Sequence, residues 1–218
     1  MERRPTTRIP LGHVGASVMR RWRRQRGTTL VELLTSTLFV SILMAISYSF
    51  ARTALRSARM QEVKSEAQEV TVMALDVLAR EIRMAGFSAA TRPVTAIGTA
   101  STDRLEVAAD LNGDGDTADS NERITYSVDD EKHELMRASG GGSPQPLVRN
   151  VPQGGVRFSF FDASGAEIPT SADSLPLSER RRIHRVDLLV RVEIPSPDPD
   201  IPAPFAATAA GSVCLRNQ

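Results

Sequence analysis

The residues with the clearest chemical potential form an acidic stretch in the middle of the chain. Residues 110–122 contain five carboxylates and no basic side chain. Hard cations such as Ca²⁺ need several oxygens that converge on one point, and alternate polar side chains followed by a glycine at a sharp turn supply that geometry. The pattern predicts a calcium loop with these ligands: Asp110, Asn112, Asp114, Asp116, Asp119 and Glu122.

This stretch matches a known calcium-binding signature only in its first half. Its first six residues follow the EF-hand pattern Asp-x-Asn-x-Asp-Gly. The twelfth position is Asn121, so the bidentate acid would be Glu122, one residue late, or Asp119. Strand-like runs flank the stretch in place of helices. A solvated acidic turn without an ion is the alternative. Outside a cell, where calcium is often millimolar, even a Kd of about 10⁻⁴ to 10⁻³ M fills such a site.

No catalytic constellation emerges from the remaining reactive residues. His133 and His184 are far apart in the sequence, and Cys214 is the only cysteine. The glycine run 140–142 lacks the lysine and the strand-to-helix context of a phosphate-binding loop. We therefore expect a protein that is not an enzyme.

A single carboxylate also stands out near the N-terminus. From Thr28 to Ala51 the chain runs for 24 residues with one charged side chain, Glu32. As a helix at about 1.5 Å per residue, this run spans about 36 Å, enough to cross a hydrocarbon core about 30 Å thick. A carboxylate in such a segment costs about 3 kcal/mol on insertion scales and usually marks function. A plain signal anchor, with Glu32 reaching toward the interface, and a cleaved secretory signal are the alternatives.

The arrangement around Gly27 resembles the class III signal of type IV prepilins, which has a basic leader, a Gly, and an apolar helix with Glu at the fifth position after the Gly. The resemblance implies that a prepilin peptidase cuts after Gly27 and methylates the new N-terminus at Thr28. It also implies that Glu32 neutralises the N-terminal ammonium of a neighbouring subunit, because two charges that are each costly in lipid offset one another when paired. The family most often has Phe where this chain has Thr28.

A second resemblance covers the end of the predicted helix. Residues 74–87 read Ala-Leu-Asp-Val-Leu-Ala-Arg-Glu-Ile-Arg-Met-Ala-Gly-Phe, which is similar to the helix end of PilW-like minor pilins. This implies a minor pilin that primes assembly of a type IV pilus, a motility organelle, or forms its tip. The implied partners are other minor and major pilins and the inner-membrane assembly platform. A related helix end in the minor pseudopilins of type II secretion keeps that machine as an alternative, beside a membrane-tethered calcium-binding or adhesive head.

The charge distribution predicts how the chain sits in a membrane. Residues 1–27 carry eight arginines against one acid and have a net charge of +7, whereas the rest of the chain carries −6. By the positive-inside tendency, the leader lies in the cytoplasm and everything after Ala51 lies beyond a single span of membrane lipid. We expect the inner membrane first, with a periplasmic or extracellular head, and then a pilus at the cell surface. Because the basic excess belongs to the leader, we expect no nucleic-acid partner.

The elements that position these residues follow from periodicity. Between Thr28 and Gly86 there is neither Pro nor Gly, and apolar residues recur at helical spacing from Val63 to Ile82, so one helix is predicted over 28–86. Alternating runs then predict strands at 104–107, 123–128, 133–137, 156–161 and 186–192, with a turn at 129–132.

An antiparallel sheet laid over the second half of the helix would cover its apolar stripe. The predicted fold class is therefore α+β and pilin-like, with a long N-terminal helix packed on an antiparallel β-sheet head. The predicted organisation is a leader at 1–27, a transmembrane half-helix at 28–51, an amphipathic half-helix at 52–86, a β-rich head at 87–194 and a Pro-rich extended tail at 195–218.

Overall fold

The computed structural model describes residues 29–90, 92–201 and 203–217 and divides into two units, residues 1–50 and residues 51–218. The leader predicted at 1–27, including Gly27, and the predicted N-terminus at Thr28 lie outside the described residues. We describe each unit by itself below.

The helix predicted from the absence of breakers forms as a single element, α1 (Leu30–Met84). Thr29 caps its first turn, since the Glu32 amide donates a hydrogen bond to the Thr29 hydroxyl at 3.3 Å. Gly86 ends it in the left-handed region at φ +78°, where a Cβ would lie 2.3 Å from the Asn217 carbonyl oxygen. Only glycine fits there without displacing backbone.

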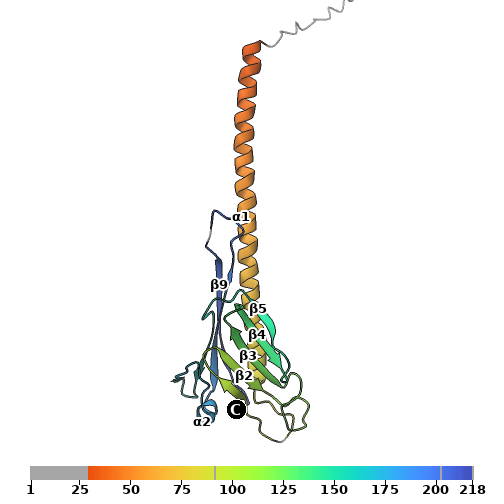
Figure 1. The fold of residues 1–218 in the computed structure, drawn as a ribbon, viewed down its shortest axis with the longest axis vertical. Coiled ribbons are helices and arrows are strands. Elements are labelled where there is room, and N and C mark those ends of the chain that lie inside the picture. Colours follow the sequence, from red (N-terminus) through yellow and green to blue (C-terminus); the bar gives the residue numbers. More distant parts are fainter. Residues whose placement is uncertain (1–28, 91, 202, 218) are drawn as a thin grey trace, which may run out of the picture. The chain divides into compact units, whose positions relative to one another are not determined.

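The second unit contains two antiparallel sheets where the sequence predicted one. The first is a five-stranded meander in chain order, with every strand paired to its neighbours along the chain (Figure 1). It consists of β1 (Ile97–Ala100), β2 (Arg104–Ala108), β3 (Arg123–Asp129), β4 (Glu134–Ser139) and β5 (Gln145–Arg149). The predicted turn joins β3 to β4, and there the Lys132 amide donates to the Asp129 carboxylate at 3.0 Å.

The second sheet has four strands in the order β7-β6-β8-β9. It consists of β6 (Val156–Phe161), β7 (Glu167–Ile168), β8 (Arg185–Ile194) and β9 (Phe205–Cys214), with a short helix α2 (Leu177–Arg180) before β8. β9 pairs with β8 over its full length, from Phe205 opposite Ile194 to Cys214 opposite Arg185. The segment predicted as a Pro-rich tail at 195–218 therefore contributes a ten-residue strand. Sequence reasoning missed it because β9 is mostly Ala, Thr, Gly and Ser, without large alternating apolar residues.

The core of the second unit lies between these sheets and α1. The buried residues of the helix recur at spacings of one to four, and they are Ala67, Thr71, Ala74, Leu78, Ala79 and Ile82. Leu78 and Ile82 are fully buried in one cluster with Tyr126, Phe158 and Phe160, which come from both sheets. The stripe predicted from the sequence is thus covered by two sheets that each supply large side chains.

A polar network fastens the same part of the helix to the meander. Glu81 of α1 forms an ion pair with Arg137 of β4 at 2.8 Å and accepts a hydrogen bond from the Tyr126 hydroxyl. Burial, and next the hydrogen bond to Glu81, raises the pKa of Tyr126. The Glu81 carboxylate likewise raises the pKa of Arg137. The three side chains together satisfy groups that would be costly to bury singly.

Candidate functional sites

The apolar segment of α1, residues 30–50, forms the first candidate site. Its large apolar side chains are all exposed, from 46% at Ile42 to 76% at Leu30 and Phe50. Among the residues that the structure describes, α1 is the one helix long and apolar enough to cross a membrane, and no residue in its most apolar window is buried. A face this apolar and this uncovered is expected to meet lipid or other protein.

Five hydroxyl side chains within the apolar segment donate hydrogen bonds to nearby carbonyls of the same helix. The hydroxyls of Thr35 and Ser36 both donate to the Glu32 carbonyl, at 3.0 and 2.7 Å. Thr37, Ser41 and Ser49 donate in the same way to carbonyls three residues earlier. Because these five hydroxyls are paired within the helix, their donors remain satisfied when the segment enters lipid.

Glu32 is the exception within this segment. It stands in the first turn of α1, where the positive end of the helix dipole stabilises a carboxylate. Its backbone amide is capped by Thr29, but its carboxylate has no hydrogen bond or ion pair to any residue that the structure describes. The predicted partner positions Gly27 and Thr28 lie outside those residues. A cationic group supplied by another molecule would complete this side chain.

The acidic loop, residues 110–122, forms the second candidate site and is rooted at Asp110. This residue is fully buried directly after β2 and pairs with Ser88 in an isolated parallel bridge. Its Oδ1 accepts from the Gly113 amide at 2.7 Å, and its Oδ2 accepts from the Ser88 hydroxyl at 3.1 Å. Both oxygens are therefore occupied: Oδ1 closes the first turn of the loop, and Oδ2 holds the loop to the segment that follows α1.

The body of the loop is a succession of turns closed by side-chain oxygens. The amides of Asp114, Asp116 and Ala118 donate to the side-chain oxygens of Asn112, Asp114 and Asp116, each two residues earlier. The Asn112 side-chain amide also donates to Asp114 at 3.0 Å and to Asp119 at 2.8 Å. The hydrogen bonds from the Asp116 amide and from Asn112 lower the pKa of Asp114. These bonds hold the carboxylates in place while they remain ionised.

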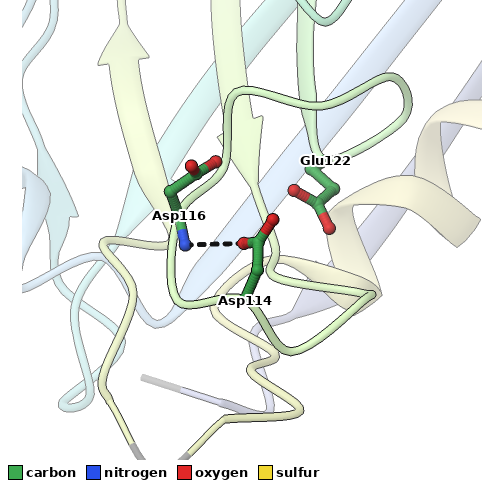
Figure 2. Close-up of side chains that lie close together, drawn as sticks. All are labelled: Asp114, Asp116 and Glu122. Carbon is green, nitrogen blue, oxygen red and sulfur yellow. Dashed lines mark hydrogen bonds between the residues drawn. The ribbon is translucent and has the colours of Figure 1, made fainter.

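Three carboxylates of the loop converge. One oxygen each from Asp114, Asp116 and Glu122 lies within 4.8 Å of the others, and Figure 2 shows Asp114 and Glu122 approaching each other across the loop. Glu122 is only 3% exposed, and its Oε1 accepts from the amides of Leu111 and Asn112 at 2.9 and 3.1 Å. Its Oε2 is buried without a hydrogen-bond partner among the described residues.

The structure thus divides the six predicted calcium ligands into two groups. Asp114, Asp116 and Glu122 come together, whereas Asp110 anchors the loop and Asn112 and Asp119 bond to each other at its rim. Sequence reasoning missed the anchoring role of Asp110 and its partner Ser88. The available signal was the position of Asp110 directly after the apolar residues Val107, Ala108 and Ala109, where a side chain is expected to be buried.

The other reactive residues singled out in the sequence remain apart. His133, at φ 56° in the turn before β4, and His184, before β8, are exposed. Cys214 is a free, exposed thiol at the end of β9. Within residues 29–90, 92–201 and 203–217, the acidic loop holds the one group of three or more His, Cys, Asp or Glu side chains close enough to share a metal ion.

Comparison with known proteins gives one structural similarity. No protein-family model matches this sequence, and no curated protein sequence matches it. Among solved structures, a type IV-like pilin from Thermus thermophilus is similar, with 12% identity and a TM-score of 0.37 over 68% of this chain and 96% of that chain. The α+β class, with a long N-terminal helix and antiparallel sheets, is confirmed in this structure.

Proposed function

We propose that this chain is a pilin-type subunit, a minor pilin that assembles through α1 into a type IV pilus machine and primes assembly or forms the tip. The observation that carries this proposal is Glu32, the one charged residue in a run of 24, which follows Gly27 by five positions and has a carboxylate without a partner among the described residues. The role is structural and uses no catalytic group.

The proposed assembly step is a pairing of charges between subunits. Cleavage after Gly27 by a prepilin peptidase creates an N-terminal ammonium on Thr28. That ammonium and the Glu32 carboxylate of a neighbouring subunit offset the cost that each would carry alone in lipid. Other minor and major pilins supply the neighbours, and the inner-membrane assembly platform brings them together.

The exposure of residues 30–50 supports the same proposal. Side chains such as Leu30 and Phe50 are exposed, and residues 29–50 of their own unit do not cover them. Membrane lipid covers them while the subunit waits in the inner membrane, and the helices of neighbouring subunits cover them in the filament. The head then lies on the periplasmic or extracellular side, opposite the basic leader.

The decisive experiment is mass spectrometry of the N-terminal peptide of the protein purified from its own membrane. A peptide that begins at Thr28 and carries one added methyl group is expected. An intact chain that still begins at Met1 would overturn the proposal, because no ammonium would then be available for Glu32. The same chain expressed without a prepilin peptidase is the matched control and should keep its leader.

A minor pseudopilin of type II secretion is the second candidate, favoured by the residues Ala74 to Phe87 at the end of α1. Both candidates share the processing and pairing steps, so the peptide experiment does not separate them. Deletion of the gene does: loss of twitching motility with normal protein secretion supports the pilus, and the reverse supports secretion. A membrane-tethered head with no filament role would show neither loss and no processing.

A further inference from the structure

The acidic loop holds a buried carboxylate oxygen that the rest of the protein leaves without a partner. Glu122 is 3% exposed, and its Oε2 has no hydrogen bond among the described residues. A buried carboxylate left partly unsatisfied carries a desolvation cost of several kcal/mol unless a positive group completes it. The surrounding loop supplies none, because residues 110–122 contain no Lys or Arg.

The nearest basic side chains do not complete it either. Arg92 approaches the loop, with its Cδ 3.7 Å from the position that a Cβ would take at Gly115. Within the described part of the chain, neither Arg92 nor Arg123 forms an ion pair with a loop carboxylate. The carboxylates of Asp114, Asp116 and Glu122 therefore face one another without a protein counter-charge.

The spacing of these carboxylates suits one particular class of ion. Ca²⁺ holds its oxygen ligands at about 2.4 Å, so two oxygens bound to the same ion lie no more than about 4.8 Å apart. The three carboxylate oxygens meet this limit, since all lie within 4.8 Å of one another. The turns closed by Asn112, Asp114 and Asp116 hold the loop side chains on rigid backbone, so little ordering remains to be done on binding.

We propose that Asp114, Asp116 and Glu122 bind one Ca²⁺ ion, which ties the tip of the acidic loop to the start of β3. This ligand set differs from the EF-hand order, because Asp110 at the first position is used to anchor the loop to Ser88. Asn112 and Asp119 stand outside the ligand set. The remaining coordination positions are filled by water, which suits a site with a Kd of about 10⁻⁴ to 10⁻³ M.

The bound ion is expected to order the acidic loop, whose two ends contact different parts of the second unit. Asp110 at one end of the loop contacts the segment after α1, and Glu122 at the other end precedes Arg123, the first residue of β3. The two positive charges of the ion offset most of the repulsion among the carboxylates of Asp114, Asp116 and Glu122, which works against keeping the loop folded onto the start of β3. Calcium binding is therefore expected to stabilise the second unit whether or not the subunit enters a filament.

The test is calorimetric titration of the full chain in detergent with CaCl₂, together with thermal unfolding. We expect one site per chain and a rise in Tm of about 3 to 11 °C at about 10 mM CaCl₂, for a Kd between about 10⁻³ and 10⁻⁴ M. MgCl₂ at the same concentration should raise Tm by less than about a third as much, because Mg²⁺ gives up its water reluctantly. No heat of binding up to this concentration, or an equal rise with MgCl₂, would overturn the site.

Isosteric variants identify the ligands. Asp116→Asn keeps an oxygen for the Ala118 amide but removes a charge, so the Kd should rise at least about tenfold. Asp119→Asn is the matched control in the same loop and should change the Kd by less than about twofold. Equal losses for the two variants would overturn the assignment.

Glu122→Gln should also abolish the calcium response, and Asp116→Asn keeps the test valid if Glu122→Gln fails to fold. Assembly is not needed for any of these measurements, so they stand apart from the proposed pilin role.

Discussion

The two segments of α1 differ in how far their apolar side chains are exposed. In the apolar segment, residues 30–50, large side chains such as Leu30, Phe39 and Phe50 are exposed. In the amphipathic segment, residues 51–84, the buried face is built mainly from small residues such as Ala67 and Ala74, with Leu78 and Ile82 near its end. Among the described residues, the first segment is exposed along its whole length, whereas the second has a face that is buried from Ala67 onward against strands of its own chain.

The carboxylates of the two segments also differ, in whether they have a partner within the chain. In the amphipathic segment, Glu81 is completed by Arg137 and Tyr126 of the same chain. In the apolar segment, Glu32 has no such partner among the described residues. One helix thus carries a carboxylate that is paired within its own chain and another that has no partner among the described residues.

The largest effect should come from Glu32→Ala, which removes the carboxylate of the apolar segment. The variant should insert and be processed normally but fail to enter the filament, because the proposed ammonium of the neighbouring subunit loses its partner. Immunoblotting of sheared surface fractions against whole membranes measures this. Glu62→Ala, which removes an exposed acid from the amphipathic segment, is the matched control and should assemble normally. Normal incorporation of Glu32→Ala would contradict the proposed pairing of Glu32 with a neighbouring subunit.

The same truncation, Ile to Ala, made once in each segment tests whether that segment is buried by its own chain. Ile82→Ala removes a fully buried side chain and should lower the free energy of unfolding by about 2–5 kcal/mol. Ile46→Ala removes a side chain that is 59% exposed and should change it by less than about 0.5 kcal/mol in detergent. Urea denaturation followed by circular dichroism measures both. Similar losses for the two variants would show that the segments are not covered differently.

The Glu81 network predicts a dependence of stability on alkaline pH. Burial, with the hydrogen bond to Glu81, raises the pKa of Tyr126 above its ordinary value of 10.0. The folded protein then holds this proton more tightly than the unfolded chain, so stability is fully present below pH 10.0 and falls as the pH rises above it. Denaturation midpoints at a series of alkaline pH values measure the fall.

Two variants sharpen this prediction. Lys132, whose pKa the Asp129 carboxylate raises, acts in the same direction at an exposed turn. Tyr126→Phe isolates the tyrosine and should flatten the alkaline fall, although it also loses the hydrogen bond to Glu81. Glu81→Gln should lower the free energy of unfolding by about 1–3 kcal/mol at neutral pH, because Arg137 loses its charged partner. An unchanged alkaline fall in Tyr126→Phe would contradict the assignment.

A small effect is expected from Arg56, which joins the amphipathic segment to the β8–β9 connection. Its guanidinium lies 3.5 Å from Asp198 and 3.0 Å from Asp200, but its side chain is 46% exposed. Because solvent screens such pairs, Arg56→Gln should lower the free energy of unfolding by less than about 1 kcal/mol. A loss as large as that of Ile82→Ala would mean that charge pairs, and not buried apolar contacts, hold this segment to the sheets.

The sequence predicted the elements that rest on periodicity. The helical pattern up to Ile82 and the alternating runs of β2, β3, β4, β6 and β8 have large apolar residues at regular spacing, and all of these elements form. β9 has no such pattern, because seven of its ten residues are Ala, Thr, Gly or Ser; at one of them, Gly211, an added Cβ would lie 2.8 Å from Cδ2 of Leu75. The division into two sheets depends on pairings between distant strands, which local patterns do not encode.

The acidic loop shows the same limit at the level of a site. Its composition predicted convergent oxygens, and three of the six named side chains do converge. The sequence could not show that Asp110 turns inward to Ser88, because that contact spans 22 positions and depends on the end of α1. Nor could it show that Glu122 is buried, which follows from its place beside Leu111 and Asn112 in the folded loop.

The contact between Gly86 and Asn217 implies an order in which the parts of the second unit fold. The meander pairs only strands that are neighbours along the chain, so it can form while later residues are still being synthesised or threaded through a translocon. The carbonyl of Asn217, 131 positions after Gly86, lies beside Gly86. β9, which precedes Asn217 in the sequence, pairs with β8. β9 and Asn217 therefore cover the end of α1 only after the residues of the meander have been made, and a nascent chain stalled before β9 is expected to leave this helix end uncovered and open to quality-control proteases.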